Sequence, residues 1–494
     1  MSDTFLTNDF RIAGAARTTA LVVILLASFM DLLDVTILNV TAPSIERDLG
    51  ASPSQLQWLL AGYTLAFAIG LITGARLGDL VGYKRMFLLG VAGFTVASAV
   101  CGMAPTPVVL ITARVVQGLF AAALIPQVLS QIQVMYAPHE RGGAMAAFSA
   151  LSGLAASIGP ILGGILIEAD LWGLGWRLVF WINVPVGLAA LVIGAKTLPE
   201  SRSPSRPRLD LIGVGLSALG LLLVVYPLIE VSGTRPWPVW TYWSMAAGVL
   251  VLIGFTCWQR LLAGRGGEPL LELSLFRIRS LRGGLLVQLL FFIPIMGFFL
   301  IFMQLLQLGI GMSPIRAGLT LLPWSIATTV TAILGAAVLV PKIGRLTVQI
   351  GLLLLALGFG LLAFVADSAT TQTGWLALLP GVLVGGAGMG FAVAPLAQLT
   401  LGEIPAAHAS SGSGLFNTVA QLAASIGVAA IGTLFFSRLS STSEQRSGTG
   451  GFGQAFSTSM WVGIVMVGVA LAASFLLPRT VDYTSPVTDT PKQE

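Results

Sequence analysis

Long apolar segments recur along the whole chain and are separated by short polar turns. A helix of about 20 apolar residues crosses a hydrocarbon core about 30 Å thick, and most of these segments reach that length. The pattern predicts fourteen membrane-spanning helices, over residues 18–40, 54–77, 86–104, 107–130, 143–168, 175–196, 209–230, 240–262, 282–307, 316–340, 346–366, 375–400, 408–436 and 457–477. We therefore expect an all-α polytopic membrane protein.

Two polar linkers, Pro199–Asp210 and Ala263–Arg282, divide the spans into groups of six, two and six. Paired six-span units are a common transporter plan, with the substrate site between them. The loop GARLGDLVGYKR at 74–85 has a weaker counterpart, GAAVLVPKIGR, at 335–345, which favours duplication of one unit. We expect an N-terminal six-helix bundle, a linker with two extra membrane helices, a C-terminal six-helix bundle and a disordered cytoplasmic tail, at 1–198, 199–279, 280–478 and 479–494.

Composition excludes a soluble globular protein, because 55% of the residues are hydrophobic, only 10% are charged and the mean hydropathy is +0.90. The 2 histidines are too few for a histidine-based metal cluster. No HExxH pair, Ser/His/Asp set or phosphate-binding loop indicates an enzyme. We therefore expect no catalytic activity, no cofactor, no metal and no nucleic-acid partner. The expected partners are the lipid bilayer, protons and small lipophilic substrates.

The distribution of Lys and Arg predicts the topology. If the N-terminus is cytoplasmic, most basic residues outside the spans fall on the cytoplasmic side, and the opposite side holds only Arg47, Arg177, Arg235, Arg316, Arg438 and Arg446. Such a bias sets the orientation of membrane proteins. We expect a multi-pass protein of the inner or plasma membrane with both termini in the cytoplasm.

Two acidic residues, Asp31 and Asp34, lie inside the first apolar span. A charged side chain at the bilayer centre costs roughly 2.5–3.5 kcal/mol on insertion scales, so such residues usually have a function. Their i, i+3 spacing places both on one helix face. Arg114 is buried by position in the fourth span, and we expect it to pair with one of these carboxylates and to take part in proton coupling. The alternative is a structural arginine that caps backbone carbonyls.

Two glycine-containing motifs, in the loop after the second span and in the fifth span, are further candidates for function. The loop at 74–85 contains Gly74, Gly78, Asp79, Gly82, Lys84 and Arg85. A tight turn with close helix approach needs glycine, and Asp79 is positioned to pair with an arginine such as Arg141, which would latch two helices together. In the fifth span, Pro160 predicts a kink, and glycines surround it at Gly159, Gly163 and Gly164.

These motifs occur together and in a specific order: LDVTILNVTAP at 33–43, GARLGDLVGYKR, RVVQG at 114–118 and IGPILGG at 158–164. The chain thereby resembles the major facilitator superfamily, and specifically its 14-span drug:H⁺ antiporter family of multidrug exporters. The resemblance covers the whole chain. It implies a site of protonation or cation recognition at Asp34, a cytoplasmic latch at Asp79 and Arg85, and proton coupling through Arg114. It also implies that the glycines and proline at 159–164 form the "antiporter" motif associated with export.

The chain departs from the family pattern in three places. Asp31 stands where an apolar residue is expected, Ala155 where a glycine is common, and no acidic residue lies well inside a span of the C-terminal half. The resemblance therefore implies a proton-driven exporter of neutral or monocationic lipophilic compounds, working by alternating access and functional as a monomer. The alternative is a dedicated exporter of one metabolite, antibiotic or lipid.

Aromatic, amide and methionine side chains suggest an adaptable substrate surface. The candidates for substrate contact are Trp58, Tyr63, Gln117, Gln127, Phe292, Met296, Asn417 and Gln421.

Overall fold

The computed structural model describes residues 14–136, 140–202, 209–231, 237–404, 409–442 and 449–479. In this part of the chain helices are joined by short turns and loops, and there are no strands. Within these described ranges, thirteen helical segments are long and apolar enough to cross a membrane. A further long helix, α5 (Arg141–Ala169), contributes the apolar segment Ser157–Ala169. The predicted all-α polytopic architecture is confirmed. Most of the expected tail, residues 480–494, lies outside the described residues.

The first six spans are built from α1 (Ala15–Leu49), α2 (Pro53–Val81), α3 (Tyr83–Gly102), α4 (Pro107–Met135), α5, and the segment η1 (Leu171–Gly173), η2 (Gly175–Arg177), α6 (Leu178–Trp181) and α7 (Asn183–Thr197). Local sequence sets the helix starts, since Ser52 and Gln55 form a capping box before α2 and Thr106 caps α4. Helix α4 packs between α2 and α3, while α1 packs against α5 and α7. This arrangement places α1 and α4 together inside the first six spans.

The two extra helices, α8 (Leu211–Glu230) and α9 (Val239–Gly264), pack against each other, and α8 also contacts α2 and α15. Asp210 fastens the start of α8, where it accepts hydrogen bonds from Gly213 N (2.8 Å), Trp258 Nε1 (2.9 Å) and Gln259 Nε2 (2.6 Å). Burial alone would raise the pKa of Asp210, but these hydrogen bonds hold it below its ordinary value. Arg76 of α2 donates to the carbonyls of the loop after α9. The insert is therefore attached to the end of α2.

The last six spans comprise α10 (Arg279–Gln304) with η4 (Leu305–Gly309), α11 (Pro314–Leu334) with η5 (Gly335–Leu339) and α12 (Val340–Ile343), α13 (Leu346–Asp367), α14 (Trp375–Leu401), α15 (Ala409–Thr442), and α16 (Thr449–Ala473) with η7 (Ser474–Leu476); η3 (Leu273–Arg277) precedes them. Their core is aromatic. The ring of Phe298 stacks on Trp324 (4.8 Å between centroids) and on Phe302 (4.9 Å). Large flat side chains fill the space between α10, α11, α13 and α16.

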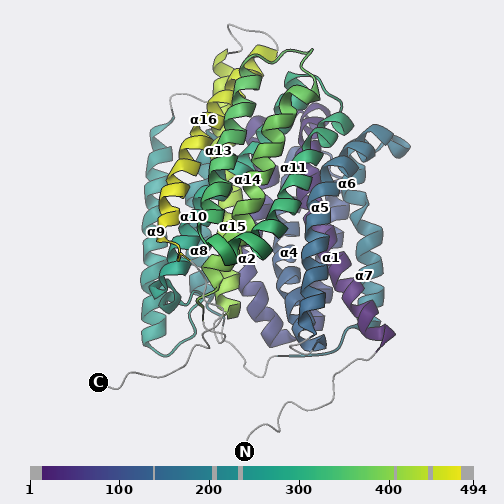
Figure 1. The fold of residues 1–494 in the computed structure, drawn as a ribbon. Coiled ribbons are helices and arrows are strands. Elements are labelled where there is room, and N and C mark those ends of the chain that lie inside the picture. The colour runs from purple at the N-terminus through teal and green to yellow at the C-terminus, as the bar shows by residue number, and fades with distance from the viewer. Residues whose placement is uncertain are drawn as a thin grey trace, which may run out of the picture.

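The helices run roughly side by side as one bundle (Figure 1). We call the end at which α1 begins the terminal end, and the end at which α1 stops the opposite end. The first and last six spans meet along α2–α15 and α5–α11. At the opposite end, Gln307 Nε2 donates to Val40 O (2.8 Å) and Gln304 Nε2 donates to Glu46 (3.2 Å). Hydrogen bonds thus hold the two groups of spans together at the opposite end.

Candidate functional site

A buried ion pair lies inside the first six spans. Asp34 of α1 and Arg114 of α4 are each only 1% exposed, and Arg114 Nη1 donates to Asp34 Oδ2. The same Nη1 donates to Gln117 Oε1 (2.8 Å), and Gln117 Nε2 donates to Asp34 Oδ1 (3.2 Å). The predicted pairing of Arg114 with a carboxylate of the first span is confirmed. In a low-dielectric interior such a pair needs added hydrogen bonds to offset its desolvation, and Gln117 supplies them.

Asn183, which the sequence analysis did not single out, completes the surroundings of Asp34. Its Nδ2 donates to Asp34 Oδ1 (2.8 Å) and to Ser98 Oγ (3.0 Å), and Ser98 Oγ donates to Phe180 O (2.9 Å). Asn183 and Ser98 are almost fully buried. Asn183 is a lone amide in the apolar run FWINVPVG, and this was the signal in the sequence that could have identified it.

Asp31 lies one helical turn from Asp34, toward the terminal end, and is 3% exposed. It accepts a hydrogen bond from the hydroxyl of Tyr63 on α2. The Tyr63 ring faces the guanidinium of Arg114, with 4.2 Å from Cζ to the ring centroid, which is a cation–π distance. The two aspartates therefore belong to one cluster but have different partners.

The predicted latch begins with a close contact between α2 and α4. Gln127 Nε2 donates to Gly74 O (2.9 Å). A Cβ at Gly78 would overlap the Gln127 side chain, and one at Gly74 would overlap the backbone of Ala122. These glycines allow the two helices to touch, and Gln127, a predicted substrate residue, lies within this contact.

The turn that follows uses Gly82 with a φ of 108°, a conformation that favours glycine. Asp79 accepts a hydrogen bond from Tyr83 Oη (2.9 Å). Lys84 lies in the first turn of α3, and Arg85 pairs with Glu200 at 3.7 Å in an exposed position. An exposed ion pair of this kind contributes about 0–1 kcal/mol to the free energy of unfolding.

Arg141 is not the partner of Asp79. Its guanidinium donates to Tyr136 O (3.1 Å) and to Gln133 O (2.9 Å), so it joins the end of α4 to the start of α5. Among the described residues, Asp79 and Arg141 form no ion pair. The expected pairing was wrong for this structure, because carbonyls at the end of α4 lie within reach of the arginine.

Part of the glycine motif in α5 faces α1 at Thr36 and Ile37, within one turn of Asp34 in the sequence. A Cβ at Gly159 would overlap Thr36 Oγ1, and a Cβ at Gly163 would lie 2.8 Å from the Ile37 side chain. Thr36 Oγ1 also donates to Ala155 O (3.4 Å). These positions bring α5 onto the helix that carries the two aspartates.

The rest of the motif faces α11. A Cβ at Gly164 would lie 2.5 Å from Ile315 Cα, and Gly318 of α11 lies directly against Pro160 O. Just beyond, Ile315 N donates to Glu168 Oε1 (2.8 Å). One motif therefore forms part of the contact between the first and last six spans.

The other predicted substrate residues lie on three helices that pack together, α2, α10 and α15. Trp58 contacts Tyr226 of α8 at 6.0 Å between ring centroids. Phe292 and Met296 are half-buried on α10, Asn417 is exposed and donates to Ser413 O (3.0 Å), and Gln421 is half-buried on α15. The structure gathers Tyr63 and Gln117 in the aspartate cluster and distributes the rest outside it.

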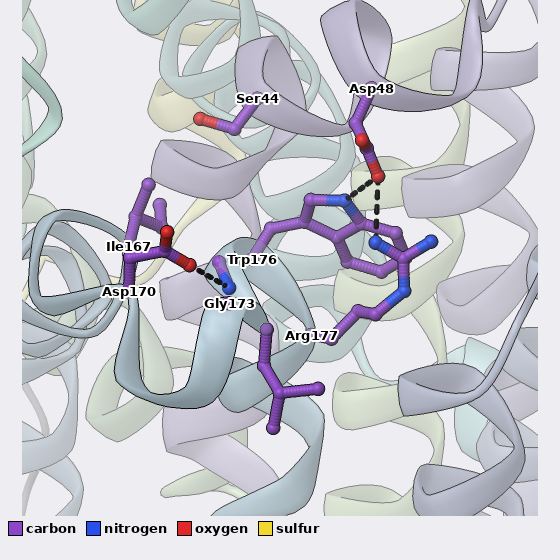
Figure 2. A pocket seen from close by; sticks show the side chains of 9 residues that line it. Ser44, Asp48, Ile167, Asp170, Gly173, Trp176 and Arg177 are labelled. Atoms are coloured by element: carbon purple, nitrogen blue, oxygen red, sulfur yellow. Dashed lines mark hydrogen bonds and ion pairs between the residues drawn. The ribbon is translucent and has the colours of Figure 1, made fainter.

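A separate cavity of about 350 Å³ opens at the opposite end and is lined by Ser44, Asp48, Ile167, Asp170, Gly173, Leu174, Gly175, Trp176 and Arg177. Figure 2 shows Asp48 accepting hydrogen bonds from Trp176 Nε1 (2.8 Å) and Arg177 Nη1 (2.7 Å). Asp170 in turn accepts a hydrogen bond from Gly175 N (2.7 Å). Asp48 and Asp170 of this cavity are therefore both hydrogen-bonded to other lining residues, whereas the buried Ser44 Oγ has no hydrogen-bond partner among the described residues.

The sequence matches the Major Facilitator Superfamily over residues 24–428. The chain belongs to this superfamily. It is 45% identical over 428 residues to the probable actinorhodin transporter of Streptomyces coelicolor, covering 86% of this chain and 74% of that protein. It is 32% identical over 424 residues to the multidrug resistance protein Stp of Mycobacterium tuberculosis, covering 85% and 76%.

A solved structure of a bacterial homologue of the lysosomal transporter Spinster, in an inward-facing and unoccupied conformation, has the same fold. The TM-score is 0.66 at 16% identity, and the match covers 94% of this chain and 97% of that one. At this identity the likeness concerns the fold alone.

Proposed function

We propose that this chain is an efflux transporter of the plasma membrane that exports lipophilic small molecules in exchange for protons, by alternating access. The observation that carries the proposal is the buried Asp34–Arg114 ion pair with Asp31 beside it. Ionisable groups inside a membrane bundle usually mark proton or ion pathways. The names of the two relatives, a transporter and a multidrug resistance protein, support export.

Alternating access requires two groups of helices that separate at one end while they close at the other. We assign these roles to residues 1–198 and 280–478, with 199–279 linking them. In the proposed cycle the contacts at the opposite end, between Gln307 and Val40 and between Gly164 and Ile315, belong to the inward-facing state. In this proposal the terminal end is cytoplasmic and the opposite end faces outward, in keeping with the distribution of Lys and Arg.

Coupling takes place at the aspartates of α1. A proton enters from the outer side, and its release to the cytoplasm accompanies substrate capture. Substrate and proton either compete for a carboxylate or act on each other through Arg114. The loop at 74–85 and Arg141, which join neighbouring helices at the terminal end, would stabilise one access state.

The substrate class follows from where the carboxylates lie. In the last six spans, Asp367 ends α13 and Glu403 follows α14, so neither offers a mid-span charge to a divalent cation. We propose neutral or monocationic lipophilic substrates, bound between α2, α10 and α15 near the predicted residues Trp58, Phe292, Met296, Asn417 and Gln421.

A dedicated exporter of one compound is the second candidate. One observation favours it: the relative at 45% identity is named for a single compound, whereas Stp, at 32%, is named for multidrug resistance. A transport panel of unrelated lipophilic compounds distinguishes the two. Several transported compounds support the multidrug exporter, and one transported compound supports the dedicated exporter.

The test uses proteoliposomes with an acidic lumen and a trapped fluorescent pH probe. Addition of a permanently charged monocationic dye should raise the luminal pH as protons leave in exchange for dye. Protein-free liposomes control for leakage, and the double variant Asp31→Asn, Asp34→Asn should abolish the response. A protein that binds dye but moves no protons would contradict proton antiport.

A further inference from the structure

The two aspartates of α1 have unequal surroundings, although they lie only one turn apart. Asp34 receives a guanidinium from Arg114 and two amide donors, from Gln117 and Asn183. Asp31 receives a single phenolic hydroxyl, from Tyr63. Both side chains are buried, so these partners decide which charge state each carboxyl group prefers.

Protonation of Asp34 is unfavourable in this arrangement. It would remove the negative partner of Arg114, which is 1% exposed, and would leave an uncompensated cation inside the bundle. It would also weaken both amide hydrogen bonds, which are strongest to an ionised acceptor. Asp34 and Arg114 therefore form a unit without net charge, and this unit favours an ionised carboxylate.

Ionisation of Asp31 is the unfavourable state at the neighbouring position. The other titratable or charged groups around it are Asp34 on its own helix, Tyr63 on α2, Cys101 on α3 and Arg114 on α4. The only cation among them is already paired with Asp34 and lies against the ring of Tyr63. An ionised Asp31 would be a buried charge without its own counter-ion, whereas a neutral Asp31 carboxyl group needs no counter-ion.

We propose that Asp31 carries the exchanged proton, while Asp34 and Arg114 form a fixed ion pair that holds the site together. In the transport cycle the Asp31 carboxyl group loses its proton to water on the terminal side and becomes a carboxylate. When the substrate is a monocation, it then replaces the proton as the compensating charge, so that one proton exchanges for one monocation. This inference rests on the proposed function and names which acid performs the coupling.

The experiment is infrared difference spectroscopy of the purified protein in detergent, titrated with pH. A protonated carboxyl group has a carbonyl stretching band that disappears on ionisation. We expect wild type to show a buried-carboxyl band and Asp31→Asn to lack it. In Asp34→Asn, Arg114 loses its partner and favours the ionised form of Asp31, so the band should titrate at lower pH than in wild type. The control Tyr63→Phe keeps the ring on Arg114 and removes only the hydroxyl, which favours the ionised form. In Tyr63→Phe the pH at which the Asp31 carboxyl band disappears should therefore be higher than in wild type.

A second readout guards against variants that fold poorly. An amide imitates a neutral carboxyl group, so Asp31→Asn should keep the wild-type melting temperature, while Asp34→Asn, which leaves Arg114 unpaired, should melt at lower temperature. The proposal is overturned if the band is absent from wild type, if it survives in Asp31→Asn, or if Asp31→Asn melts as low as Asp34→Asn. None of these readouts requires transport. Failure of dye-driven proton exchange would therefore contradict the proposed function without touching the assignment of the proton to Asp31.

Discussion

The contact between α5 and α11 leads to a prediction about closure of the opposite end. A Cβ at Gly164 would lie 2.5 Å from Ile315 Cα and 2.8 Å from Ile315 N, both backbone atoms that no rotamer change can move. Ordinary contact begins at 3.4 Å, so Gly164→Ala requires α5 and α11 to separate by about 0.9 Å. Overpacking of this kind costs about 1–3 kcal/mol, a shift of about 5- to 150-fold in the equilibrium between the closed and open opposite end.

Spin-label distance measurement gives the readout. Labels at two exposed positions near the opposite end, Leu171 and Leu319, would be attached in a background with Cys257→Ser, because Cys257 is exposed. Gly164→Ala should add a longer distance component and slow export while leaving the protein folded. Gly143→Ala is the control on the same helix, because nothing lies within 4 Å of its Cβ. Identical distance distributions for Gly164→Ala and wild type, or equal effects of both variants, would refute the reasoning.

Three further predictions follow from the cluster, the α2–α4 contact and the insert. Asn183→Ala removes a donor to a buried carboxylate and should lower the free energy of unfolding by about 1.5–3 kcal/mol. Ser98→Ala should cost about 1 kcal/mol; equal losses in denaturant titrations would contradict this ranking. Gly78→Ala should destabilise the protein because its Cβ overlaps Gln127, and the second change Gln127→Ala should restore the melting temperature; no rescue would disprove the clash. The pKa of Asp210 lies below its ordinary value of 3.8, so its stabilisation is full above that value and is lost as pH falls through the lowered pKa. The melting temperature of wild type should therefore fall as the pH drops below about 4, whereas Asp210→Ala should start lower at neutral pH and fall less; parallel curves for the two proteins would contradict this.

The length of the apolar segments predicted the membrane-spanning helices well. In lipid a helix must form all backbone hydrogen bonds within itself, so a segment needs only sufficient length and apolar side chains to span the membrane. Charge also predicted that Arg114 pairs with one of the two aspartates of the first span, since a buried arginine requires a negative partner; the structure shows that the partner is Asp34, 80 residues away in the sequence. These features depend on the cost of polar groups in lipid, which the sequence displays directly.

Choices among several polar partners could not be predicted. Arg141 contacts carbonyls at the end of α4 in preference to Asp79, and Gln127 fills the space above Gly78 in preference to a substrate surface. Both outcomes depend on how the helices are rotated about their axes. The contact of Asn183 with Asp34 could not be predicted for the same reason. Whether an amide in an apolar helix reaches a buried charge depends on which way that helix faces.

The ion pair also bears on how the chain enters the membrane. Asp34 and Arg114 are 80 residues apart, so at the moment the first span leaves the ribosome its cationic partner has not been synthesised. That span must then enter with its carboxyl groups neutral, or wait at a protein-lined insertion site until the fourth span arrives, since a lone charge in lipid is costly. In either case the Asp34–Arg114 ion pair forms only after the fourth span has been synthesised.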